Sequence, residues 1–118
     1  MQKINLNNLA RITHEIVPEL NQMHEESDGI YLLFGHLARY LGEGLQSGNV
    51  SDDVIDKVFV LLNAMASHKD MNIVNIFTVG FLEVFLDYEG ALIVLKNKLN
   101  SKGLQLLEEI RDFWMGKE

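Results

Sequence analysis

The chain has 118 residues, no cysteine and a formal net charge of −7 at pH 7. This length predicts a single domain over residues 1–118 with one core. Without cysteine, neither disulfides nor thiolate metal sites can form, and the negative charge disfavours nucleic acid and anionic membrane surfaces as partners. The start of the chain lacks the apolar core of a secretory signal, and the apolar stretches are shorter than a membrane span. We therefore expect a cytoplasmic protein.

The negative charge is concentrated in one part of the sequence. Nine of the seventeen carboxylates lie between Glu15 and Asp56, where Arg39 is the only Lys or Arg, so this segment carries about −8 and the remainder +1. Such a field attracts a basic partner over about 8 Å at physiological salt and raises association rates by roughly ten- to a thousand-fold. A basic protein is therefore the expected class of partner.

Apolar residues recur at helical spacing in nearly every segment, which predicts an all-α fold of about six helices. The first is expected over Leu6–Met23, with Pro18 on its polar side, where a kink is favoured over a break. The second is expected to follow a cap at Ser27 or Asp28 and to end at Gly48. The residues expected on the core face of these two helices are Leu6, Leu9, Ile16, Val17, Leu20 and Met23, then Ile30, Leu33, Phe34, Leu37, Ala38, Leu41 and Leu45.

Two further helix starts carry clear capping signals. Ser51 is expected to cap the third helix and Asp70 the fourth, with Asp52 and Asp53 near the positive end of the third helix dipole. The fourth helix is apolar nearly all round, which is typical of an inner helix. The residues expected to be buried in this pair are Val54, Ile55, Val58, Phe59, Leu62, Met65 and Ala66, then Ile73, Val74, Phe77, Phe81, Leu82 and Phe85.

The pattern after Gly90 fits two structures. Residues 91–99 could form a short helix or a strand, and Ser101 is expected to cap a last helix. The residues expected to face inward on that helix are Leu106, Leu107, Ile110, Phe113 and Trp114. Short loops predict that successive helices are antiparallel neighbours, arranged either as HEAT-like pairs or as a compact orthogonal bundle.

No pattern predicts a catalytic, metal or cofactor site. The four histidines lie on separate elements without ligand-like spacing. Glu83 and Asp87, one helical turn apart, could form an acid/base pair, but a solvated stripe or a contact with a partner is favoured. Leu32 is an apolar residue within a charged stripe, which is the composition of a small protein-binding patch. A singly exposed leucine is also normal on a protein surface.

Two segments, Gly29–Leu41 (GIYLLFGHLARYL) and Met71–Phe85 (MNIVNIFTVGFLEVF), resemble small bacterial helical proteins of the immunity-protein type. The similarity consists mostly of core residues and carries no active-site motif. It implies a cytoplasmic domain, encoded beside a secreted or contact-delivered toxin, that binds the toxin and blocks it. Many such toxins are nucleases with basic grooves, which an acidic protein can occupy as a phosphate mimic.

We therefore predict a non-enzymatic immunity protein that occludes a basic toxin domain. The carboxylates expected to bind it are Glu25, Glu26 and Asp28 at the first turn, and Asp52, Asp53 and Asp56 at the opening of the third helix. The alternative is a helical adaptor or regulatory subunit. In that case Leu32 and the stripe of Glu83 and Asp87 would form the interface.

Overall fold

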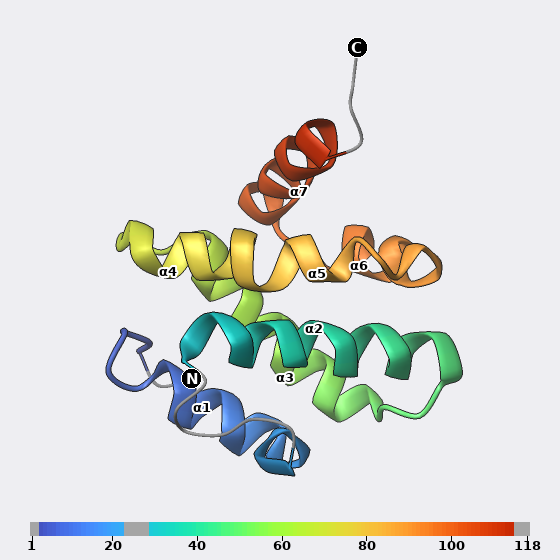
Figure 1. Cartoon of the computed structure of the whole chain (residues 1–118), viewed down its shortest axis with the longest axis horizontal. Helices are drawn as coiled ribbons and strands as arrows, with labels where there is room; N and C mark the ends of the chain where they lie inside the picture. Colours follow the sequence, from blue (N-terminus) through green and yellow to red (C-terminus); the bar gives the residue numbers. More distant parts are fainter. Residues whose placement is uncertain (1–2, 23–28, 115–118) are drawn as a thin grey trace.

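The computed structural model describes residues 3–22 and 29–114, and within these ranges the chain forms helices and no strand (Figure 1). The elements are α1 (Leu9–Ile16), η1 (Pro18–Gln22, a 3-10 helix), α2 (Ile30–Ser47), α3 (Asp52–Ala66), α4 (Met71–Asn75), η3 (Ile76–Leu82, a π-helix), α5 (Glu83–Phe85), η4 (Glu89–Ala91, a 3-10 helix), α6 (Leu92–Lys98) and α7 (Ser101–Trp114). The elements α4, η3 and α5 follow one another without a break and form one run. With this run counted once, the described residues contain six helices besides the short 3-10 helices η1 and η4, which confirms the predicted all-α fold of about six helices.

The helical conformation is interrupted just before Pro18. Val17 has φ −128° and ψ 82°, outside the helical region, because the ring of a following proline disfavours helical backbone in the residue before it. The kinked helix predicted over Leu6–Met23 is therefore wrong: α1 ends at Ile16 and a separate 3-10 helix follows. Leu6, expected in the core, is 46% exposed. Met23 and the predicted caps Ser27 and Asp28 lie outside the described residues.

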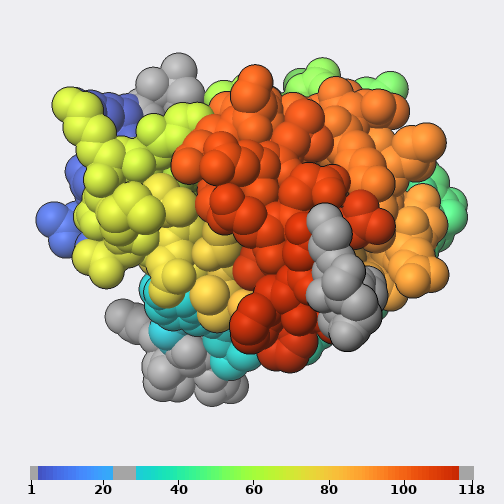
Figure 2. All heavy atoms as spheres, turned by 90° about the horizontal axis from the view of Figure 1, so that it is seen from above, coloured from blue at the N-terminus to red at the C-terminus, as the bar shows by residue number. Residues whose placement is uncertain are grey.

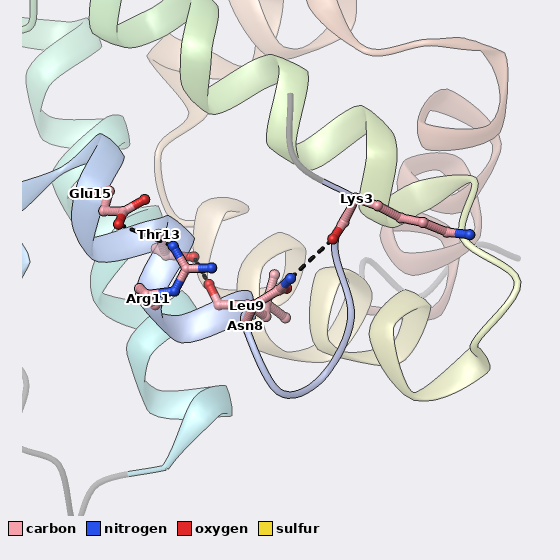
Figure 3. A network of polar contacts seen from close by, with 6 residues as sticks. All are labelled: Lys3, Asn8, Leu9, Arg11, Thr13 and Glu15. Carbon is pink, nitrogen blue, oxygen red and sulfur yellow. Dashed lines mark hydrogen bonds and ion pairs between the residues drawn. The ribbon is translucent and has the colours of Figure 1, made fainter.

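Asn5 and Asn8 shape the entry into α1, and Figure 3 shows Asn8. The Oδ1 of Asn8 accepts a hydrogen bond from the backbone N–H of Asn5 at 2.8 Å, and the Oδ1 of Asn5 accepts one from the N–H of Asn8 at 3.0 Å. The side-chain amide of Asn8 also donates to the carbonyl oxygen of Lys3 at 3.0 Å. These bonds fix the N-terminal segment in front of the helix.

The centre of the fold is a pair of helices that are not adjacent in sequence, α2 and the run α4–η3–α5. Near the start of both, the side-chain amide of Asn75 donates to the hydroxyl of Tyr31 at 2.9 Å. Near their ends, the hydroxyl of Tyr88 donates to Glu43 at 3.3 Å. The two helices are therefore parallel, both running from left to right in Figure 1. The antiparallel pairing predicted for successive helices does not describe this central pair. Its two members are not successive, because α3 lies between them in the sequence and returns the chain to the side where α2 begins.

Glycine allows this pair to approach closely. A Cβ on Gly80 would lie 3.3 Å from the Cβ of Phe34 and 3.4 Å from the carbonyl oxygen of Tyr31. Both distances are at the lower limit of ordinary packing, so the absence of a side chain at Gly80 lets the backbone of η3 lie against α2.

The inner position predicted for the fourth helix is confirmed. Phe77, Phe81 and Phe85 have no exposed surface. Their rings stack in a column with centroid separations of 6.1 Å and 5.3 Å. Phe77 and Phe81 lie in η3, and Phe85 lies just after it. The turns of η3 are those of a π-helix, in which an N–H bonds to the carbonyl five residues earlier, as the N–H of Glu83 does with Thr78.

The predicted caps of α3 and of the fourth helix are also confirmed. The hydroxyl of Ser51 accepts from the N–H of Val54 at 3.3 Å, and the carboxylate of Asp70 accepts from the N–H of Asn72 at 2.9 Å. Leu61, which was not placed on the core face of α3, is fully buried. Gly48 ends α2 with φ 77°, the left-handed conformation that glycine favours.

The C-terminal part corrects three expectations. Residues 92–98 are helical, so the strand alternative is wrong. Asn100, and not Ser101, caps α7, since its Oδ1 accepts from the N–H of Gly103 at 2.8 Å. Phe113 and Trp114 are 75% and 56% exposed, because α7 lies across the outside of the bundle between α4 and α6 (Figure 2) and its last turn extends beyond the core.

The bundle is compact. Its Cα radius of gyration is 13.3 Å, close to the roughly 13–14 Å of a globular domain of this length. Among the described helices, none has both the length and the apolarity needed to cross a membrane.

Candidate functional site

The structure describes three of the six carboxylates that were predicted to bind a partner. Glu25, Glu26 and Asp28 lie outside the described residues. Asp52, Asp53 and Asp56 are exposed in the first turns of α3, as predicted. Asp53 pairs with Lys57 at 3.1 Å and Asp56 with Lys98 at 3.6 Å. Lysines from outside the acidic segment therefore compensate part of its charge in space.

The residues proposed for the alternative interface lie on other helices. Leu32 is 43% exposed on α2. Glu83 is partly buried in α5, and Asp87 is exposed just after it. None of these three residues, and none of the carboxylates of α3, lines a depression that is formed by described residues of the acidic segment alone.

That depression, here called the acidic pocket, lies between η1, the second half of α2 and the connection to α3. Its volume is about 460 Å³, and it is lined by Glu19, Tyr40, Glu43, Gly44, Ser47, Asn49 and Val50. Two carboxylates, two hydroxyls and one amide therefore converge on one concave surface, and all of them come from the segment of charge −8.

Tyrosine hydroxyls orient both carboxylates of the acidic pocket. Tyr40 donates to Oε2 of Glu19 at 3.1 Å, and Tyr88 donates to Oε2 of Glu43 at 3.3 Å. Burial, the hydrogen bond and the charge of Glu19 all raise the pKa of Tyr40. Burial is the first cause that raises the pKa of Tyr88, followed by the charge of Glu43. Both phenols therefore stay protonated as donors at neutral pH, and each carboxylate keeps further lone pairs for a ligand.

Two local features of the sequence build the floor and rim of the acidic pocket. The break at Pro18 starts a new helix, which places Glu19 opposite Tyr40. The connection after α2 folds back onto Gly44, where a Cβ would lie 1.9 Å from Cγ2 of Val50. Gly44 therefore lets this connection pack closely against α2.

The acidic pocket has the chemistry of a cation subsite. Carboxylates form the strongest hydrogen bonds with charged donors, and a guanidinium fits one of them with two parallel N–H bonds. A metal ion would need more ligands, and no group of three His, Asp or Glu side chains suited to one occurs in the part of the chain that the structure describes. The two carboxylates of the pocket can accept hydrogen bonds from a lysine or arginine side chain.

His68 has a structural role. Its Nδ1 accepts from the backbone N–H of Asp70 at 3.0 Å, and its Nε2 lies 3.0 Å from the carbonyl oxygen of Ile4. Since a backbone N–H can only donate, Nδ1 carries no proton and the proton on Nε2 points at Ile4. The ring thus ties the N-terminal segment to the connection after α3.

Sequence reasoning missed the three residues that define the acidic pocket, Glu19, Tyr40 and Glu43. Glu19 falls within the range that was predicted as one long helix, Leu6–Met23, whereas it lies in the separate helix η1. A sequence analysis that ended the first helix before Pro18 would have separated Glu19 from α1. The charge pattern did identify the segment to which it belongs.

One family model matches residues 7–115, a range that includes α1 through α7 and every residue of the acidic pocket. The chain belongs to the family described as domain of unknown function (DUF7674). Neither the curated proteins nor the solved structures contain a match to it. The acidic pocket is thus formed entirely within the region that the family model covers.

Proposed function

We propose that the protein is an immunity protein that binds a basic toxin domain and blocks it, with the acidic pocket holding a lysine or arginine of the toxin. The observation that carries this proposal is the convergence of Glu19 and Glu43 on one concave surface. Tyr40 and Tyr88 hold these carboxylates in place, so little side-chain freedom is lost when a cation binds.

The surrounding charge supports a two-part mode of recognition. The exposed carboxylates at the opening of α3 attract a basic partner at long range, and they contribute mainly to the rate of encounter. The acidic pocket then retains one cationic side chain at short range and contributes mainly to the dissociation rate. Occlusion of the basic groove of a nuclease toxin is the effect that this arrangement suits.

A helical adaptor is the second candidate. It is favoured by large apolar side chains that are exposed on α2 and at the end of α7, namely Tyr31, Leu32, Phe113 and Trp114. An adaptor would bury such residues against a partner within a larger complex. It would not need the carboxylates of the acidic pocket.

Growth protection by designed variants tests the choice. A toxin domain encoded beside this gene is the partner that the proposal expects. It is expressed in a bacterial host with the parent chain or a variant, and binding is measured with the purified pair at several salt concentrations. Glu19→Gln with Glu43→Gln removes two charges from the acidic pocket but keeps hydrogen-bond acceptors for the tyrosines. The matched control is Glu108→Gln with Glu109→Gln, which removes two charges from α7 on the opposite side of the bundle (Figure 1).

The proposal predicts one-to-one inhibition without turnover. The double variant of the acidic pocket should dissociate faster and protect less, with a loss of roughly 2 to 5 kcal/mol if the pair is desolvated, whereas the α7 control should protect fully. The variant Glu83→Gln with Asp87→Asn should also protect the host. Loss of protection in this variant would instead indicate catalysis by that carboxylate pair. Retained protection by the pocket variant, together with loss of protection in Leu32→Ser or Phe113→Ser, would place the toxin interface on these apolar side chains. Absence of protection by the parent chain itself would favour the adaptor.

A further inference from the structure

A second depression, here called the apolar pocket, lies between the N-terminal segment, the second half of α3 and the connection after it. Its volume is about 400 Å³, and it is lined by Lys3, Ile4, Val60, Ala64, Ser67, His68 and Lys69. None of these residues lines the acidic pocket, so the two depressions are separate sites. This volume is within the range of small-molecule pockets, about 300 to 1,000 Å³.

The apolar pocket has a floor that solvent reaches. Val60 is 52% exposed, although both of its sequence neighbours on α3 are buried. Ala64 follows one helical turn later on the same side of α3, and Ile4 closes the floor from the N-terminal segment. An apolar ligand would remove the exposed part of this surface from water, which favours binding.

The walls are fixed by hydrogen bonds. His68 uses both ring nitrogens within the protein, one toward Asp70 and one toward Ile4, each at 3.0 Å. The imidazole therefore holds the two sides of the apolar pocket together and has no free donor for a ligand. Asn8 strengthens the same wall through its bond to the carbonyl of Lys3 at 3.0 Å (Figure 3).

The rim carries positive charge. Lys3 and Lys69 are both exposed lining residues, and no carboxylate is among the residues that line the apolar pocket. The side chain of Lys3 extends away from α1 (Figure 3). Since both ring nitrogens of His68 are hydrogen-bonded within the protein, the ammonium groups of Lys3 and Lys69 are the donors that an anionic group on a ligand would meet. An apolar floor below two cations complements a molecule with a short apolar tail and one negative head.

We propose that the apolar pocket binds an alkyl carboxylate, with the tail on Val60 and Ala64 and the carboxylate between Lys3 and Lys69. The lining from Val60 on α3 to Ser67, the residue that follows this helix, corresponds to about 10 Å along the helix axis, which suits a medium-length chain. This site does not depend on the function proposed for the acidic pocket.

Titration of the full chain with alkyl carboxylates tests this proposal by calorimetry and by amide chemical shifts. The series hexanoate, heptanoate and octanoate should gain about three- to fourfold in affinity with each added methylene. The shifts should concentrate on residues 3–4 and 60–69. Octanol, which has the tail but no charge, should bind more weakly than octanoate.

Two pairs of variants assign the tail and the head. Ala64→Leu fills the floor and should abolish octanoate binding, whereas the control Ala10→Leu, at an exposed position of α1, should leave it unchanged.

Lys3→Gln with Lys69→Gln should lower octanoate affinity by roughly two- to tenfold without changing octanol binding. The matched control is Lys96→Gln with Lys102→Gln. Thermal unfolding of each variant verifies that the fold is retained.

The proposal is overturned if affinity does not rise with chain length, or if folded Ala64→Leu binds octanoate like the parent. Shifts spread evenly over the lysines of the chain would also overturn it, because they indicate ion binding without a pocket.

Discussion

The ring of Tyr88 lies directly against the backbone of Gly42: a Cβ on Gly42 would be 2.4 Å from Cγ of the ring. The same tyrosine donates to Glu43 at 3.3 Å. Gly42 thus provides the space for the side chain that orients one carboxylate of the acidic pocket. The packing of α2 and the geometry of the pocket are coupled at this contact.

Gly42→Ala should destabilise the fold. A methyl group at this position overlaps the ring, and overpacking costs about 1 to 3 kcal/mol, which exceeds the gain of about 1 kcal/mol from replacing a helical glycine by alanine. Urea unfolding measures the difference as a lower midpoint at unchanged slope.

Gly35→Ala is the matched control on the same helix. Its Cβ would meet Val84 at 3.7 Å and the carbonyl oxygen of Gly80 at 3.8 Å, which are ordinary contacts. This variant should be as stable as the parent or more stable, by up to about 1 kcal/mol. Equal effects of the two substitutions would contradict the close contact between Gly42 and Tyr88.

Asn100→Ala should cost more stability than Ser101→Ala. The side chain of Asn100 caps α7 and also donates to Ser67 at 3.1 Å and to the carbonyl of Asn63 at 3.3 Å. Loss of a cap costs about 0.5 to 2 kcal/mol, and the tertiary bonds add to this. Ser101 lies inside the helix and is exposed, so its replacement should change stability by less than about 0.5 kcal/mol. Thermal unfolding compares the two, and the reverse order would show that Ser101 is the cap.

Phe81→Ala should destabilise the protein by roughly 3 to 5 kcal/mol, because it opens a cavity in a fully buried site and removes the middle ring of the column. Phe113→Ala, at a position that is 75% exposed, should cost less than about 0.5 kcal/mol. Denaturant unfolding of both variants tests whether η3 is the centre of the core. A loss below about 1 kcal/mol for Phe81→Ala would place it near the surface.

Stability should fall in alkaline solution. The pKa of Tyr40 is raised above its ordinary value of 10.0 by burial and then by its bond to Glu19, so the folded state holds the phenolic proton more tightly than the unfolded chain. The contribution of this group is complete below the unfolded pKa and is lost as pH rises through the folded pKa. Tyr88 has the same sign, with burial as the first cause.

The contribution of Tyr40 can be isolated by Tyr40→Phe. The parent should lose stability more steeply than this variant above about pH 10, and the difference between the two should be constant in the neutral range. Urea midpoints across the pH range provide the measurement. Parallel curves for the two proteins in alkaline solution would show that the pKa of Tyr40 is not raised.

Sequence patterns predicted the local features of this fold. Ser51 and Asp70 cap their helices through groups within one turn, and Gly48 ends α2 through its own backbone conformation. The apolar faces of α2 and α3 were also predicted, since burial follows helical periodicity. These features depend on residues close together in the chain.

Features that depend on distant residues were not predicted. Asn100 and Ser101 are both good caps, and the choice between them is made by Asn63, whose Oδ1 accepts from the N–H of Asn100 at 2.9 Å. The acidic pocket depends on η1 meeting α2 after the break at Pro18. The compensation of Asp56 by Lys98 likewise joins two helices far apart in sequence.

The parallel pairing of α2 with the α4–η3–α5 run has a consequence for how the chain acquires its structure. Gly35 and Gly80 meet across this contact although 45 positions separate them in sequence. An up-and-down bundle can assemble from hairpins as it is synthesised, but here the central contact forms only after α3 has returned the chain. Folding should therefore be slower than in a sequential bundle of equal size, because non-local contacts raise the contact order. Until the second helix of the pair leaves the ribosome, the apolar side of α2 lacks its main partner, and exposed apolar surface of this kind promotes aggregation.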